Sequence, residues 1–206
     1  MPLHLEKIFD EEDKEGKKRK RGVPSIKVVA GIIGLCWISP KKNREIAKAI
    51  GVSDSVISEA MNSYFLNSNL IVVDRSDPKR KRLSYTVNFI GLIDYLTELM
   101  GDSFTGRKEE ILYIIMNNRA NVGRTFLENF VLNETYKKGL AKVRFLYEAI
   151  PELLILLILS VDATAPRNKV YTHFLQCLYK TISRKYENKE PLLFVWSGFL
   201  WFVLER

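Results

Sequence analysis

The chain of 206 residues is 47% hydrophobic, which is enough apolar material for one large or two small packed domains and excludes an intrinsically disordered protein. Its formal net charge of +8 permits nucleic-acid or anionic-membrane partners without choosing between them. Only two cysteines occur, Cys36 and Cys177, each in an apolar helical pattern. This usage argues against a disulfide framework and predicts buried free thiols in an intracellular, reducing compartment.

No secretory signal and no membrane-spanning segment are predicted. The first 21 residues are charged, whereas a signal peptide needs an apolar stretch of about 7–15 residues. The two most apolar runs, 153–161 and 192–204, fall short of the roughly 20 residues that cross a bilayer as a helix. We interpret both runs as buried core helices.

Residues 1–22 form a charged arm in which an acidic run is followed directly by a basic one. Like charges repel and core-forming residues are scarce, so the arm is predicted to be disordered. Two interpretations of the basic run stay open: a tail that follows a phosphate backbone or minor groove, and a segment that only adds solubility. The basic residues are Lys17, Lys18, Arg19, Lys20 and Arg21.

A first helix is predicted to open near Pro24 and to end at Ser39-Pro40. Apolar residues recur in it at helical spacing, at positions 26, 29, 33, 36 and 37. That face is expected to be part of a core.

The following segment, 43–62, resembles a helix-turn-helix along its whole length. Asn43 can cap a short first helix, and Gly51 supplies the positive φ that a tight turn needs. A second helix is expected over about 54–66, capped by Ser53 or Asp54, with an inward stripe at positions 57, 60, 61 and 64. Its outward face, which in a helix-turn-helix lies in the major groove, comprises Ser53, Asp54, Ser55, Ser58, Glu59 and Asn62.

A basic hairpin is predicted directly after this helix. Residues 69–75 have the pattern of a strand, 76–82 that of a turn and 83–87 that of a returning strand. The hairpin end, 75–83, carries Arg75, Lys79, Arg80, Lys81 and Arg82. A helix that begins after Asn88 and reaches Met100 is expected to close this unit.

The series Asn69-Leu-Ile, Asp77-Pro78, Arg80, Arg82 and Val87-Asn88-x-x-Gly91 resembles the wing and following helix of MarR-type winged helix-turn-helix regulators and their archaeal relatives. The resemblance covers residues 23–100 and implies binding of duplex DNA, usually as a dimer. It assigns base contacts to Ser55, Ser58, Glu59 and Asn62, and backbone or minor-groove contacts to Arg80 and Arg82, with charge added by Lys79 and Lys81.

The charge distribution predicts which contacts supply the affinity. Residues 14–90 hold 16 Lys and Arg against six Asp and Glu, whereas residues 107–206 hold 15 against ten. The outward face of the second helix has no Lys or Arg, although Arg to guanine is the commonest specific base contact. Most affinity is therefore expected from the wing, from the arm, and from Lys41, Lys42 and Arg44.

The second half of the chain is predicted to be helical. Residues 101–106 have the composition of a linker. Helical patterns follow at about 107–118, 122–132, 134–149, 151–161, 168–187 and 192–205. The predicted fold class is therefore mainly α, with a winged helix-turn-helix domain of three helices and a hairpin at 23–100, followed by an all-α domain at 107–206.

The helical domain is expected to supply homodimerisation, or to bind a partner or an effector. The aromatic segment 194–202 is apolar on too many faces for a free surface helix, so we interpret it as part of the core or of a subunit interface.

No catalytic constellation is apparent, and neither enzymatic activity nor a cofactor is predicted. His173 has no Cys or His near it in sequence, and the chain has too few of these residues for an ordinary structural zinc site. No glycine-rich phosphate loop occurs. Three functions remain: a cytoplasmic, nucleoid-associated transcriptional regulator; a replication, partition or chromosome-organising protein; and a module that binds protein or RNA.

Overall fold

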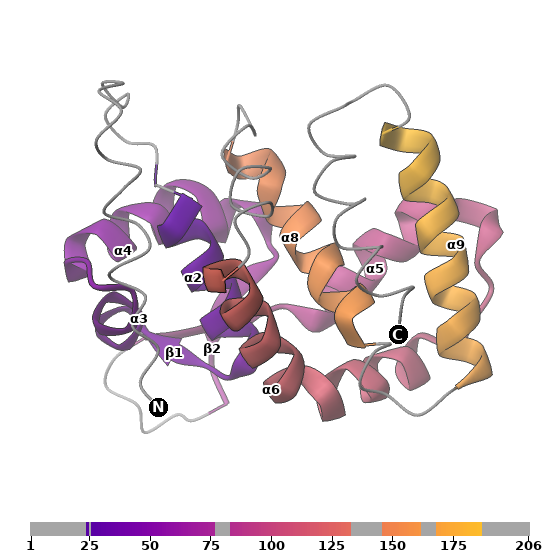
Figure 1. Ribbon diagram of the computed structural model, residues 1–206, viewed down its shortest axis with the longest axis horizontal. Helices are drawn as coiled ribbons and strands as arrows, with labels where there is room; N and C mark the ends of the chain where they lie inside the picture. The colour runs from indigo at the N-terminus through magenta and orange to yellow at the C-terminus, as the bar shows by residue number, and fades with distance from the viewer. Residues whose placement is uncertain (1–23, 25, 77–82, 133–145, 162–167, 187–206) are drawn as a thin grey trace.

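The computed structural model describes residues 24, 26–76, 83–132, 146–161 and 168–186, and most of these are helical (Figure 1). The α-helices are α2 (Ile26–Ile38), α3 (Asn43–Ile50), α4 (Asp54–Ala60), α5 (Phe89–Met100), α6 (Lys108–Leu132), α8 (Leu146–Val161) and α9 (Lys169–Tyr186). The strands are β1 (Lys41–Lys42), β2 (Ile71–Asp74) and β3 (Ser84–Val87). The prediction of a mainly helical fold is confirmed. Searched over the same residues, no helix has both the length and the apolar character needed to span a membrane.

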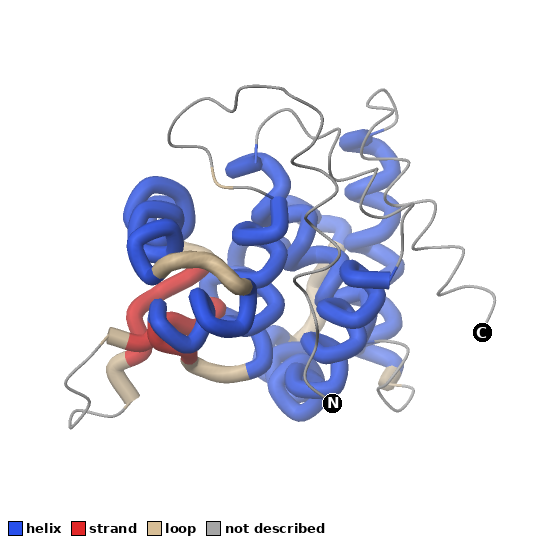
Figure 2. The backbone as a smooth tube through the Cα atoms, turned by 60° about the vertical axis from the view of Figure 1, so that its left-hand side comes forward, coloured by secondary structure: helices blue, strands red, loops and turns tan. Residues whose placement is uncertain are grey.

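The three strands form an antiparallel sheet in the order β1-β3-β2, at one edge of the helical body (Figure 2). In the central strand, Thr86 pairs with Val72 of β2 and Tyr85 pairs with Lys41 of β1. One face of the sheet is buried and includes Ile71 and Val87, while Val72 and Thr86 on the other face are half-buried. The predicted strands at 69–75 and 83–87 correspond to β2 and β3.

Helix α2 lies at the centre of the core. Val28, Ile32 and Trp37 are almost completely buried. The helix contacts α3 and β3 as well as α6 and α8, so it is surrounded on several sides. It ends at Ile38, close to the predicted end, because Pro40 cannot continue the helical hydrogen bonding.

Helices α2 and α6 approach each other closely at two glycines. A Cβ added at Gly34 of α2 would lie 2.5 Å from Cδ2 of Leu127, and one added at Gly123 of α6 would collide with Ile38. Small residues at these positions allow the two backbones to come together. Within the described residues, this is the most extensive contact between two helices.

Two helix breaks predicted from the sequence are wrong. Residues 119–121 do not separate two helices, because α6 is continuous from Lys108 to Leu132 and this stretch contains neither Gly nor Pro. Pro151 does not begin a helix, because it lies within α8, whose described part starts at Leu146.

Several predicted elements fall outside the described residues. These are the arm 1–22, most of the helix 134–149, the helix 192–205 and the aromatic segment 194–202.

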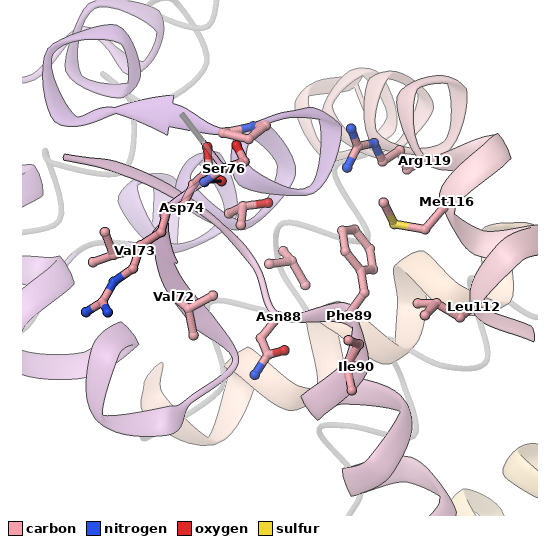
Figure 3. A pocket seen from close by; sticks show the side chains of 14 residues that line it. Val72, Val73, Asp74, Ser76, Asn88, Phe89, Ile90, Leu112, Met116 and Arg119 are labelled. Carbon is pink, nitrogen blue, oxygen red and sulfur yellow. Dashed lines mark hydrogen bonds between the residues drawn. The ribbon is translucent and has the colours of Figure 1, made fainter. Parts of the chain in front are cut away.

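An open groove with a volume of about 510 Å³ lies between the half-buried face of the sheet and α6 (Figure 3). Val72 and Asp74 of β2 are on one side, and Leu112, Met116 and Arg119 of α6 are on the other. Phe89 and Ile90, at the start of α5, also line it. The groove was not predicted, because three segments that are distant in sequence form it.

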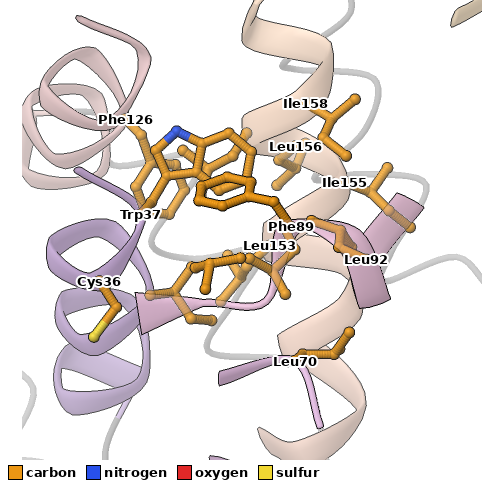
Figure 4. Packing of buried hydrophobic residues seen from close by; sticks show 14 of the residues in the cluster. Cys36, Trp37, Leu70, Phe89, Leu92, Phe126, Leu153, Ile155, Leu156 and Ile158 are labelled. Carbon is orange, nitrogen blue, oxygen red and sulfur yellow. The ribbon is translucent and has the colours of Figure 1, made fainter. Parts of the chain in front are cut away.

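The helices on the two sides of the predicted linker share one hydrophobic cluster, which extends from Val28 in α2 to Ile182 in α9. Figure 4 shows Trp37, Phe89 and Phe126 gathered beside residues of α8. The linker itself is held against α9, because the thiol of Cys177 donates to the carbonyl oxygen of Ser103 at 2.8 Å. The division into two domains stays a prediction, but its two sides are packed together throughout the described residues.

Candidate nucleic-acid interface

A tight turn at Gly51 joins α3 to α4. Gly51 has φ 76° and ψ 40°, the left-handed conformation predicted for it. The N–H groups of Gly51 and Val52 both donate to the carbonyl oxygen of Ala47, at 2.9 and 3.1 Å. Ile50 and Ile57 are buried on the two sides of the turn, so the helices are fixed relative to each other by packing as well as by the turn.

The start of α3 differs from the prediction. Lys42, rather than Asn43, is the capping residue, and its N–H donates to a carboxylate oxygen of Glu45 at 2.9 Å. The prediction failed because Lys42 is held in extended conformation by its pairing with Ser84, so that Asn43 is already helical. The side chain of Asn43 instead donates from Nδ2 to Oγ of Ser58 at 2.9 Å, which links α3 to α4.

The face of α4 predicted to read bases is largely open to solvent. Ser53 is the capping residue, one of the two that were predicted. The exposed positions are Ser53, Asp54, Ser55, Glu59 and Asn62. Ser58 differs from them, because it is half-buried and its hydroxyl accepts the hydrogen bond from Asn43.

The helical path continues beyond α4 with a change of winding. Met61–Phe65 is a π-helical turn and Leu66–Ser68 is a 3-10 turn. The helical path therefore runs to Ser68, two residues beyond the end of the predicted helix 54–66. Met61 and Phe65 are buried, so this part of the path contributes to the core. Asn69 ends the path with a positive φ of 56°.

The loop of the hairpin begins directly after β2. Arg75, at its beginning, is exposed, and the N–H of Ser76 donates to Oδ1 of Asp74 at 3.1 Å, which starts the turn. Residues 77–82 are outside the described residues, and so are Lys79, Arg80, Lys81 and Arg82 of the predicted wing. The same holds for Lys17, Lys18, Arg19, Lys20 and Arg21 of the arm.

Further cations are grouped around β1 and α3. Lys41 and Lys42 are half-buried in β1, and Arg44 is exposed in the first turn of α3. Lys48, also exposed, was missed in the sequence, although its spacing of four residues from Arg44 places both on one side of α3. These side chains add to the positive charge beside α4.

Comparison with known proteins found no match to any family model, curated protein or solved structure. Among the described residues, no cluster of His, Cys, Asp and Glu could hold a metal ion. His173 stacks on Phe104 and lies 3.6 Å from the sulfur of Cys177, measured from Nε2. Its contacts therefore join α9 to the segment between α5 and α6.

Proposed function

We propose that this protein binds duplex DNA through a winged helix-turn-helix that comprises α2, α3, α4 and the hairpin β2–β3. The observation that carries the proposal is the Gly51 turn, which presents an exposed polar face of α4 next to a hairpin whose tip is rich in Lys and Arg. In helix-turn-helix proteins the second helix occupies the major groove. The order of elements along the chain supports it, because the hairpin β2–β3 follows α4 after the two short turns at 61–68.

The side chains of α4 limit what this surface reads. Asn62 can contact adenine through its amide, and Glu59 can accept a hydrogen bond from the amino group of cytosine. Ser58 is better suited to holding α4 against α3, since it already accepts a hydrogen bond from Asn43. A face with short polar groups and no cation supplies modest sequence preference.

Contacts to the DNA backbone would supply most of the affinity for DNA. Arg44 and Lys48 lie on α3, Lys41 and Lys42 lie on β1, and Arg75 lies at the start of the hairpin loop. Lysine and arginine contacts to phosphates release counterions, so the affinity is expected to fall steeply with salt.

We propose transcriptional regulation as the role of this binding. The absence of Lys and Arg from the described face of α4 favours a second candidate, a replication, partition or chromosome-organising protein with little sequence preference.

Selection from a random duplex library at two salt concentrations tests both roles. A palindromic consensus would support a dimeric regulator. Salt-sensitive binding without a consensus would support the second candidate, and no binding at low salt would contradict DNA binding altogether.

Charge reversal in the wing tests the binding surface. The double variant Arg80→Glu with Arg82→Glu is expected to lower affinity at least tenfold and to reduce the slope of log K against log salt by about two, because two phosphate contacts are lost. Fluorescence anisotropy with a labelled duplex at several salt concentrations measures both quantities.

The matched control is Lys180→Glu with Arg184→Glu. These residues are exposed on α9, which Figure 1 shows on the opposite side of the molecule from α4. The control changes the net charge by the same amount. Equal losses in the two double variants would show a general charge effect and contradict the proposed surface.

A further inference from the structure

Helix α6 has an apolar stripe along the open groove that separates it from the sheet. Leu112 and Met116 follow each other at helical spacing, with Glu109 before them and Arg119 after them, and we call these four residues the α6 stripe. Tyr113 beside the stripe is 68% exposed, and Ile90 of α5, across the groove, is 65% exposed. Single exposed apolar residues are ordinary, but a contiguous group marks an interaction surface.

The charged residues at the two ends of the stripe differ in their ion pairing from the charged residues next to Glu109. Arg107 pairs with Glu110 at 2.6 Å, and Lys108 pairs with Asp94 at 2.7 Å. Neither Glu109 nor Arg119 forms an ion pair with any of the described residues. The stripe therefore has apolar residues in the middle, an unpaired negative charge at one end and an unpaired positive charge at the other.

This pattern is complementary to itself when the direction of the helix is reversed. Position 114 is the midpoint between Leu112 and Met116, and also the midpoint between Glu109 and Arg119. In an antiparallel pair of identical helices related by a two-fold axis at that level, Glu109 of each copy stands level with Arg119 of the other. The two charged ends are about 15 Å apart along the helix, so long side chains can meet at both ends while Leu112 stands level with Met116.

We infer that a second copy of this chain covers the α6 stripe, with the two α6 helices antiparallel. A parallel pair would bring like charges together at both ends, which opposes that arrangement. The open groove beside the stripe, lined by Ile90 and Met116, gives space for the exposed side chains of the second copy. The interface has the isologous form of most homodimers and does not depend on DNA binding.

The test exchanges the charges at the two ends. Glu109→Arg alone places Arg against Arg at both ends, and Arg119→Glu alone places Glu against Glu. Each single variant is expected to raise the dimer dissociation constant at least tenfold, measured by analytical ultracentrifugation of the full chain over a concentration series. The double variant restores opposite charges and is expected to return the constant to within about threefold of the wild type.

Mixing the two single variants gives an independent readout. All end contacts in the mixed dimer pair opposite charges, so the mixture is expected to form heterodimers that neither variant forms alone. Arg124→Glu, an exposed change on α6 outside the stripe, is the control and should leave dimerisation unchanged.

Three results would overturn the inference. One is a wild-type chain that stays monomeric at its highest soluble concentration. Another is a wild-type dimer that neither single variant weakens. The third is weakening of the dimer by the single variants without restoration in either the double variant or the mixture.

Discussion

Cys36 shows how burial decides the chemistry of a single residue in this protein. Its side chain is completely buried in α2, and this burial raises the pKa of the thiol to about 12 from an ordinary value of 9.0, against a smaller opposing effect of Lys41. A thiol with such a pKa holds its proton at neutral pH and is a poor nucleophile. Cys36 is therefore a packing residue, as its apolar sequence context predicted.

The raised pKa predicts a specific dependence of stability on pH. Above about pH 9 the thiol ionises in the unfolded chain but not in the folded one, so its contribution to the free energy of unfolding is complete below pH 9 and is lost as the pH rises towards 12. The slope from this one group approaches about 1.4 kcal/mol per pH unit. Cys36→Ala should remove that slope.

Urea unfolding of the wild type and of Cys36→Ala at several pH values between about 8 and 10.5 measures the difference. The variant is less stable at pH 8 because it leaves a cavity, and the gap is expected to narrow as the pH rises. Two parallel curves would contradict the assigned pKa.

At the scale of elements, the contact between α2 and α6 depends on the absence of a side chain at Gly123. Helix propensity alone predicts that Gly123→Ala stabilises α6 by roughly 0.5–1 kcal/mol. The added Cβ would meet Ile38, however, and overpacking of this kind costs roughly 1–3 kcal/mol. The packing effect is larger, so the variant is expected to be less stable than the wild type.

Thermal unfolding followed by circular dichroism gives the sign directly. The control is Asn117→Ala, an exposed position on the same helix, where propensity should dominate and stability should rise slightly. A stabilised Gly123→Ala variant would show that the two helices are not in close contact.

The elements that the sequence predicts well are those specified by nearby residues. Gly51 determines the turn before α4, and Asn88 caps α5 by accepting from the N–H of Gly91 at 3.0 Å, both within a few positions. Strand β1 has only two residues and is defined by its pairing with β3, so no local sequence pattern indicates it. The cap at Lys42 was missed for the same reason.

The candidate interface was predictable to a similar extent. The exposed polar face of α4 follows from helical periodicity, which also places Ile57 in the core. The half-burial of Ser58 depends on its contact with Asn43 of another helix. The groove beside Arg119 depends on the placement of the sheet and α6, both of which contact α2, and the local sequence does not encode that placement.

At the scale of the molecule, α2 packs against elements from both halves of the chain. Trp37 is completely buried, and its ring lies 4.9 Å from that of Phe89 between centroids. Another part of the surface of α2 is covered by α6 and α8. Removal of these two helices would expose an apolar surface at the centre of the core.

A fragment of residues 24–106 is therefore expected to be substantially less stable than the intact chain, although it contains all the elements of the proposed DNA-binding unit. Trp37 is its only tryptophan, since the other two are at positions 196 and 201. The fluorescence maximum of Trp37 in the fragment is expected at the long wavelength of a solvent-exposed tryptophan, and unfolding of the fragment in urea is expected to begin at a lower concentration than that of the intact chain. A fragment with buried Trp37 and cooperative unfolding would instead establish an independent domain at 23–100.

The central position of α2 also sets an order of events during synthesis. Helix α2 leaves the ribosome before α3, α6 and α8, the helices that it contacts, and α8 ends only at Val161. At synthesis rates of about 5–20 residues per second, the intervening 120 or so residues take roughly 6–24 s to appear. During that interval the apolar surface of α2 is not yet covered by α8. The nascent chain is therefore expected to bind chaperones that recognise exposed hydrophobic segments.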